Sequence, residues 1–194
     1  DNGVIVCQVG EGADELFWGY PAWKTYLNLQ RWNDKPVPRF VKRAGVAAAG
    51  AIGKGQRLEV ELLRRAADGQ PVFWGGVNAF THEQKMRLLS PRLRASLGGL
   101  TSWEAIRPIH ERYEAGRWEN SHLSWMSYAD LNLRLPELLL MRVDKMSMGV
   151  SLEGRVPFLD HRFVGFAMSI PEQVKTNGGT LKHILKKAVR GVIP

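Results

Sequence analysis

Three carboxylates follow a glycine-flanked turn near the beginning of the chain. Glu11, Asp14 and Glu15 come shortly after the apolar run at residues 4–7, within the stretch Gly-Glu-Gly-Ala-Asp-Glu. A strand end, a tight turn and a helix N-terminus together turn backbone N–H groups outward, which suits an anion. Carboxylates at that place would repel a phosphate unless a divalent cation lay between the carboxylates and the phosphate. The pattern predicts a Mg²⁺–phosphate edge, and the alternative is an ordinary strand-to-helix connection whose acids favour the helix dipole.

A second charged segment lies between residues 141 and 161. Arg142 and Lys145 are three positions apart and share one face of a predicted helix. Two cations on one face repel each other unless an anion lies beside them. Glu153, Arg155 and Asp160 follow in a predicted loop, where paired charges could fix the geometry. The alternative is a salt-bridge network that only ties the helix to the loop, and the spacing leaves both interpretations open.

The last segment with helical spacing begins after a glycine turn. Its apolar stripe, which we expect to be buried, consists of Leu181, Ile184, Leu185 and Ala188. Its basic row consists of Lys182, Lys186 and Arg190. Such a row is usually a solvated face. Lys182 differs from the others only in its place on the first turn, where a ligand could approach.

Nearly everything after the first strand is predicted to be helical. Apolar residues at three- and four-residue spacing predict helices near 21–32, 38–50, 56–67, 82–89, 103–115, 121–133, 137–148, 160–169 and 180–191. Thr81, Ser102, Asp160 and Thr180 are the predicted N-caps, and Pro136 is expected to separate two helices. Residues 68–78 and 153–157 are predicted loops, and 177–179 a turn.

Composition limits the class of protein without choosing a function. The chain has 194 residues, 44% of them hydrophobic and 24% charged, as in an ordinary globular protein. Its formal net charge of +8 favours an anionic partner: a nucleotide, pyrophosphate, nucleic acid or an acidic membrane face. No stretch approaches the roughly 20 apolar residues of a membrane span. A single cysteine, Cys7, is typical of a reducing cytoplasm, and a start on an apolar strand without Met predicts a piece of a longer chain.

In their order and residue sequence, three segments resemble the synthetase domain of the glutamine-hydrolysing asparagine synthetases. They are Gly-Glu-Gly-Ala-Asp-Glu-Leu-Phe, then Arg-Val-Asp-Lys-Met-Ser-Met with Ser-Leu-Glu-Gly-Arg-Val-Pro-Phe-Leu-Asp, then Lys-His-Ile-Leu-Lys. The resemblance covers residues 9–20 and 130–194, whereas residues 30–120 carry no motif of that family.

The resemblance implies a fold and a reaction. The fold is α/β: the C-terminal, predominantly helical part of an adenine-nucleotide-hydrolase-like (ATP-pyrophosphatase) domain, with at least one N-terminal strand, over residues 1–194. The reaction uses ATP and Mg²⁺ to convert the aspartate side-chain carboxylate into an aspartyl-adenylate and pyrophosphate. Ammonia, released from glutamine by an N-terminal glutaminase domain, then displaces AMP. The resemblance further implies a cytoplasmic ligase of asparagine biosynthesis without nucleic-acid or membrane partners, in which a homodimer is allowed.

The same resemblance implies the site residues. The catalytic ones are Lys182, Glu11 and Arg142; the nucleotide-binding ones are Gly10, Gly12, Asp14 and Lys145; the metal ligand is Asp14. Asp14 would hold Mg²⁺ on the pyrophosphate side, and Glu11 would face the reacting centre. Lys182 would neutralise charge that develops at the α-phosphate and the leaving pyrophosphate. Gly10 and Gly12 would permit close approach of the backbone.

The chain departs from the family's pattern at two positions and lacks two of its parts. Val9 replaces the usual serine, and Trp18 stands where the family has glycine, which leaves the acceptor open to another carboxylate such as a uronic acid. The ATP loop Ser-Gly-Gly-x-Asp-Ser is absent, because the similar residues 96–102 lack the aspartate and are interpreted as a helix stop and cap. The glutaminase part is absent too. We therefore predict that residues 1–194 alone turn over neither ATP nor glutamine.

Other functions remain as alternatives. A β-lactam synthetase would share the adenylation chemistry but close a ring instead of using ammonia. A noncatalytic scaffold of the same ancestry is compatible with Val9 and Trp18. A basic helical nucleic-acid-binding module would explain the charge of +8 but none of the three motifs, and its affinity would fall steeply with salt.

Overall fold

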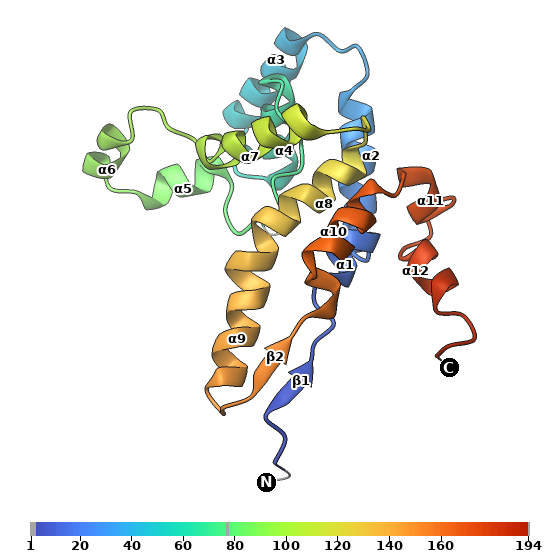
Figure 1. Ribbon diagram of the computed structural model, residues 1–194. Helices are drawn as coiled ribbons and strands as arrows, with labels where there is room; N and C mark the ends of the chain where they lie inside the picture. The colour runs from blue at the N-terminus through green and yellow to red at the C-terminus, as the bar shows by residue number, and fades with distance from the viewer. Residues whose placement is uncertain (1–2, 77, 194) are drawn as a thin grey trace. The chain divides into compact units, whose positions relative to one another are not determined.

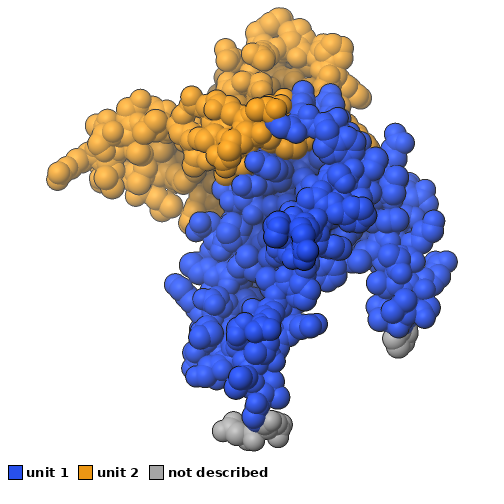
Figure 2. Space-filling model, viewed as in Figure 1, with its two compact units in different colours: residues 1–24, 116–194 blue, residues 25–115 orange. Residues whose placement is uncertain are grey.

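The computed structural model describes residues 3–76 and 78–193 (Figure 1). The chain forms two compact units, drawn in different colours in Figure 2. Unit 1 comprises residues 1–24 and 116–194, and unit 2 comprises residues 25–115. All three recognised motifs fall in unit 1, because the segments that carry them are the two ends of the chain.

Unit 1 is mainly helical around a short parallel sheet. Its elements are β1 (Val6–Gln8), α1 (Ala13–Phe17), α8 (His122–Asn132), the π-helix η1 (Leu135–Leu140), α9 (Met141–Met148), β2 (Glu153–Arg155), the 3₁₀-helix η2 (Pro157–Leu159), α10 (His161–Ser169), α11 (Glu172–Thr176) and α12 (His183–Ala188). The structure thus confirms a largely helical α/β chain with a strand at its N-terminal end. That its fold is the ATP-pyrophosphatase type stays an expectation.

The sheet joins the two ends of the sequence. β1 and β2 run parallel, with Cys7 opposite Gly154, and the Val9 N–H donates to the Arg155 carbonyl at 2.7 Å. The prediction of a loop at residues 153–157 is therefore wrong, since β2 occupies 153–155 and η2 begins at Pro157. A three-residue strand that contains glycine carries no periodic signal of its own, and its partner lies at the far end of the chain.

A small apolar core fixes α1 against the C-terminal elements. Leu16, Phe17 and Ala167 are buried together, and Phe17 meets the ring of Phe158 edge-on, with the centroids 6.4 Å apart. The partly buried residues packed against them are Leu131, Phe158, Phe163, Val164, Met168, Ile170, Ile184 and Leu185. These contacts bring α1, η2, α10 and α12 together. Ala188, expected in the buried stripe, is exposed.

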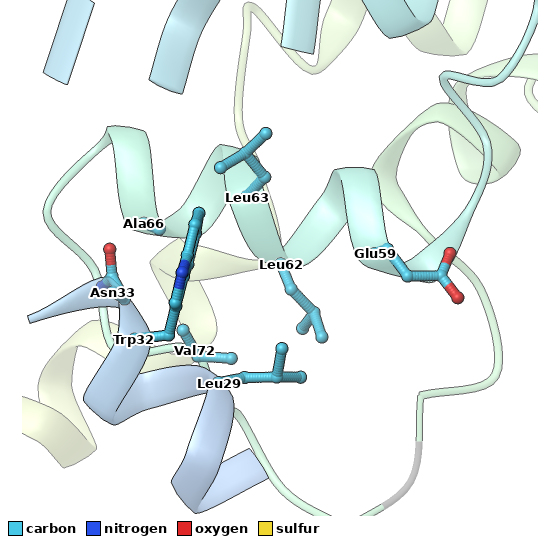
Figure 3. A pocket seen from close by; sticks show the side chains of 8 residues that line it. All are labelled: Leu29, Trp32, Asn33, Glu59, Leu62, Leu63, Ala66 and Val72. Atoms are coloured by element: carbon cyan, nitrogen blue, oxygen red, sulfur yellow. The ribbon is translucent and has the colours of Figure 1, made fainter. Parts of the chain in front are cut away.

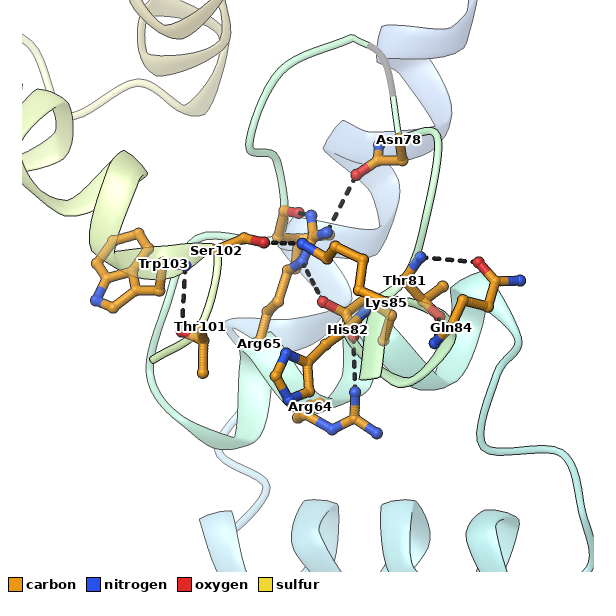
Figure 4. Close-up of polar contacts among 12 residues, drawn as sticks. Arg64, Arg65, Asn78, Thr81, His82, Gln84, Lys85, Thr101, Ser102 and Trp103 are labelled. Carbon is orange, nitrogen blue, oxygen red and sulfur yellow. Dashed lines mark hydrogen bonds and ion pairs between the residues drawn. The ribbon is translucent and has the colours of Figure 1, made fainter. Parts of the chain in front are cut away.

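Unit 2 is formed by α3 (Arg39–Ala51), α4 (Leu58–Ala67), α5 (His82–Leu88) and α6 (Pro91–Ser96), while α2 (Ala22–Asn33) and α7 (Trp103–Gly116) run across its limits. Arg65 of α4 is buried, and its guanidinium donates to the Glu61 carboxylate, the Val72 carbonyl and the Asn78 amide oxygen (Figure 4). Its guanidinium carbon also lies 3.9 Å from the centre of the Trp74 ring. These partners satisfy a charge that would otherwise be costly to bury.

A small apolar pocket of about 70 Å³ also lies within unit 2 (Figure 3). Its lining residues, from α2, α4 and the loop after α4, are Leu29, Trp32, Asn33, Glu59, Leu62, Leu63, Ala66 and Val72. None of the residues predicted to act in the site lines it.

Several predicted helix boundaries are confirmed and others are wrong. Thr81 caps α5 in a full capping box with Gln84, and Asp160 caps α10 by accepting from two backbone N–H groups. Ser102 does not cap α7: the Thr101 hydroxyl accepts from the Trp103 N–H, and the Ser102 hydroxyl instead accepts from Lys85. Thr180 is not a cap either, because α12 begins only after Lys182.

Pro136 does not separate two helices. It lies in the first turn of η1, and η1 continues directly into α9. Proline is tolerated in a first turn, where its missing N–H removes no intrahelical hydrogen bond. The interruption falls earlier, at Leu133, which follows the end of α8. Residues 68–76 and 78 form the predicted loop, whereas position 77 lies outside the described residues. No helix among the described residues is long and apolar enough to span a membrane.

Candidate functional site

The turn between β1 and α1 requires glycine at one position. Gly12 has φ +93°, in the left-handed region, and a Cβ there would lie 2.9 Å from Leu159 Cγ. Backbone strain and crowding therefore both exclude a larger residue. Gly10 is exposed and has open space around it, and Glu11 between them is half-buried. The turn thus packs against η2 on its Gly12 side and opens to solvent at Gly10.

Asp14 and Lys182, from opposite ends of the sequence, form an ion pair. Lys182 Nζ lies 2.7 Å from Asp14 Oδ1, and the two side chains are 30% and 39% exposed. The backbone holds the lysine in place, because its N–H donates to the Phe17 carbonyl at 3.0 Å. Lys182 adopts φ +54°, which is costly for a residue with a side chain. The pair remains open to a ligand from the solvent side.

Gly19 lies directly beneath this ion pair. A Cβ at Gly19 would overlap both Asp14 Oδ1 and Lys182 Cε. The Gly19 N–H donates to the Asp14 carbonyl at 2.8 Å, so the backbone of α1 turns back under its own aspartate. The absent side chain at Gly19 is what leaves room for the pair. Sequence reasoning did not include this residue in the site, although it is the glycine of the Trp-Gly-Tyr stretch.

Trp18, between Phe17 and Gly19, is buried. Its indole N–H donates to the Ser127 hydroxyl at 3.1 Å, and that hydroxyl donates to the Glu15 carbonyl at 2.6 Å. Trp18 itself has φ +56°. The tryptophan that departs from the family's pattern therefore anchors α1 to α8.

Glu15 does not belong to a solvent-facing metal edge. Its side chain is fully buried, and its Oε1 accepts from the Tyr20 hydroxyl at 2.6 Å. Burial and the hydrogen bond to Glu15 raise the pKa of Tyr20 above its ordinary range. The expectation that Glu15 shares a cation with Asp14 is wrong, because α1 turns successive side chains to different faces: Asp14 outward and Glu15 inward.

The structure does not bring Arg142 and Lys145 to the ion pair. Both are exposed on α9, and within residues 3–76 and 78–193 neither side chain makes a hydrogen bond or ion pair. The side of α9 that packs on β2 is marked by Val143, whose Cγ1 would lie 3.4 Å from a Cβ at Gly154. Glu153 pairs with Arg155 at 2.7 Å, which lowers the pKa of the glutamate, and Asp160 caps α10. For Glu153, Arg155 and Asp160 the structure favours the interpretation as a local salt bridge and a helix cap.

Asp14 fits a Mg²⁺ site to which the protein contributes one carboxylate and the nucleotide contributes further ligands. No group of three or more His, Cys, Asp or Glu side chains in the described part of the chain is placed to hold a metal ion. Mg²⁺ at nucleotide sites, however, is usually held by one or two carboxylates together with phosphate oxygens and water. One half-exposed carboxylate beside a lysine is compatible with that arrangement. The other ligands would come from the nucleotide and from groups outside this set.

Comparison with known proteins identifies the family. The sequence model described as "Asparagine synthase" matches residues 1–194. The chain belongs to the asparagine synthase family. It is 32% identical over 194 residues to asparagine synthetase [glutamine-hydrolyzing] 1 of Bacillus subtilis, covering 98% of this chain and 29% of that protein. A putative asparagine synthetase [glutamine-hydrolyzing] of Mycobacterium bovis is 29% identical over 191 residues, with 98% and 28% covered.

Local similarity is higher in part of the family. Asparagine synthetase [glutamine-hydrolyzing] 3 of Bacillus subtilis is 52% identical over 56 residues, which is 29% of this chain and 9% of that protein. No solved structure matches the chain. The chain thus spans less than a third of the length of the relatives that match it throughout.

Proposed function

We propose that this chain supplies the Asp14–Lys182 portion of the synthetase site of an ATP-dependent amidotransferase that makes asparagine. The observation that carries the proposal is the 2.7 Å ion pair between residues from the first and last recognised motifs. A structural salt bridge would not need the glycine beneath it or the left-handed backbone at Lys182. Membership in the asparagine synthase family supports the same assignment.

The reaction has two steps. A side-chain carboxylate oxygen of aspartate attacks the α-phosphorus of ATP, an acyl–oxygen–phosphorus bond forms, and the bond to pyrophosphate breaks. Ammonia then attacks the acyl carbon, loses a proton, and AMP leaves. Negative charge grows on the phosphate oxygens in the first step, and a fixed cation stabilises that growth. In our proposal Lys182 is that cation.

The neighbouring residues would orient the same centre. Asp14 holds the lysine in the absence of nucleotide and would provide one ligand to Mg²⁺, which would neutralise charge on the phosphates when bound. Glu11 and the open backbone at Gly10 would face the reacting groups, whereas Gly12 maintains the turn. Arg142 and Lys145 could act only on a part of the substrate that extends toward α9, since they lie outside the Asp14–Lys182 cluster.

The acceptor is aspartate in this proposal, and a different carboxylate is an outcome of the test. Trp18 does not favour another acceptor, because its side chain is buried and its indole N–H is taken by Ser127. The ammonia donor is glutamine, through a glutaminase domain outside residues 1–194. A cytoplasmic location is part of the proposal and fits the single cysteine.

The test uses a longer protein in which this chain is joined to the upstream ATP-loop and glutaminase regions. Pyrophosphate and AMP release are measured with aspartate, glutamate and uronic acids as acceptors. We expect release with aspartate, and a loss of at least a hundredfold in kcat for Lys182→Ala. Lys187→Ala, an exposed lysine on α12, is the matched control. The proposal would be contradicted if none of the carboxylates supported release of pyrophosphate and AMP. An unchanged rate for Lys182→Ala would also contradict it.

A further inference from the structure

Lys175 is a buried lysine to which the proposed chemistry gives no role. It lies on α11 with 1% of its surface exposed, and its amine has no hydrogen-bond partner among the described residues. The amine is 5.8 Å from the centre of the Trp18 ring, which is also buried. Burial lowers the pKa of Lys175 to about 8, and the negative charge of Glu119 opposes that shift.

The energy of this arrangement does not explain the lysine. Burying an ammonium without an ion-pair partner costs more free energy than a cation–π contact returns. An apolar side chain of similar volume would stabilise the fold more. The charge at Lys175 therefore costs stability, and its role lies in what its contact with Trp18 holds in place.

What the contact holds is the segment that carries Lys182. Trp18 lies between Phe17, whose carbonyl accepts the Lys182 N–H, and Gly19, which lies beneath the Asp14–Lys182 pair. The indole N–H at the edge of the Trp18 ring is tied to Ser127. The ring thus contacts both α8 and the amine of Lys175.

The other end of α11 is anchored independently. The Glu119 carboxylate accepts from the Glu172 backbone N–H at 3.3 Å, and the Glu172 carboxylate accepts from the Ser121 hydroxyl at 2.5 Å. A fixed start at Glu172 and a fixed contact at Lys175 leave α11 little freedom. The short turn at residues 177–182 then leads directly into the ion pair.

We propose that Lys175 is a positioning residue for Lys182: its contact with Trp18 locks α11 onto the end of α1 and so sets Lys182 opposite Asp14. The inference deepens the proposed function, because it says how the C-terminal lysine is held. It makes a claim about geometry that can be measured without nucleotide or turnover.

The experiment measures how fast Lys182 is acetylated in the 194-residue chain, read by peptide mass spectrometry. An amine held 2.7 Å from a carboxylate is less accessible to the acylating reagent than one that moves freely in solvent. We expect Lys175→Met to raise the labelling rate of Lys182 at least threefold while the melting temperature stays equal or rises. Lys175→Arg, which keeps the charge, should restore slow labelling, and Lys187→Met should leave it unchanged.

Each other outcome counts against the proposal. A folded Lys175→Met chain with wild-type labelling of Lys182 would overturn it, and so would a Lys175→Met chain that does not fold, because the lysine would then serve the fold itself. Fast labelling in Lys175→Arg as well would assign the effect to packing. Labelling of Lys182 needs no substrate, so this inference and the proposed function are tested separately. The inference fails if labelling is unaffected even though pyrophosphate release is normal. It holds if labelling changes as expected even though no carboxylate supports release.

Discussion

At the scale of single residues, Gly19 has the most direct geometric requirement. A methyl group there would overlap the Asp14 carboxylate and the Lys182 side chain. We expect Gly19→Ala to lower kcat for pyrophosphate release at least tenfold, which corresponds to about 1.4 kcal/mol. Gly165→Ala is the matched control, because Gly165 on α10 has open space around it. Equal activity of the two variants would show that the ion pair does not need its present geometry.

The lowered pKa of Lys175 should make the free energy of unfolding depend on pH. Its pKa is near 8 in the folded chain and near 10.5 when unfolded, so the folded state binds fewer protons between these values. The free energy of unfolding therefore rises with pH from about 8 to 10.5, and below pH 8 the buried charge costs about 3 kcal/mol. Glu119 is the charged neighbour that opposes this shift.

Lys175→Met removes that titration. We expect the variant to be more stable than the wild type at pH 7 and the difference to shrink towards zero near pH 10.5, as measured by urea unfolding at both values. A difference that is constant over this range would mean that the amine keeps its ordinary pKa.

At the scale of elements, α5 offers the cleanest test of a sequence-predicted cap. The Thr81 hydroxyl accepts from the Gln84 N–H, and the Gln84 side chain accepts from the Thr81 N–H. Thr81→Ala should cost about 1 kcal/mol of unfolding free energy, and Thr81→Ser should restore most of it. If chemical denaturation finds all three proteins equally stable, the capping box contributes nothing.

The elements also show what local sequence can and cannot predict. The caps at Thr81 and Asp160 were predictable, because each places a side-chain oxygen before a periodic segment. β2 was not, since its partner strand lies at the other end of the chain. The cap expected at Thr180 failed because tertiary contacts, including the Lys182 N–H bond to Phe17, delay the start of α12.

The candidate site divides in the same way. Asp14 and Lys182 could be named from motifs, but motifs do not show that the two side chains touch. The inward turn of Glu15 follows from its place on α1, and only the packed structure shows its bond to Tyr20. Lys175 carried no signal, because its burial depends on a tryptophan that is distant in sequence.

At the scale of the whole molecule, the site residues belong to one of the two compact units. Unit 2 provides a separate core, in which Leu62 is 7% exposed beside the apolar pocket. Leu62→Ala should lower the free energy of unfolding by about 2–4 kcal/mol and leave slow acetylation of Lys182 unchanged below the melting temperature. Faster labelling of Lys182 in this variant would mean that unit 2 helps to set the geometry of the ion pair.

The account depends most on the claim that Asp14 and Lys182 act as one unit on the nucleotide. The direct test is a double-mutant cycle of Asp14→Asn and Lys182→Met on the rate of aspartate-dependent pyrophosphate release in the longer protein. We predict that the double variant is about as slow as the slower single variant, with an interaction energy of about 1–3 kcal/mol. Strictly additive losses would show that the two residues act independently and would contradict the account.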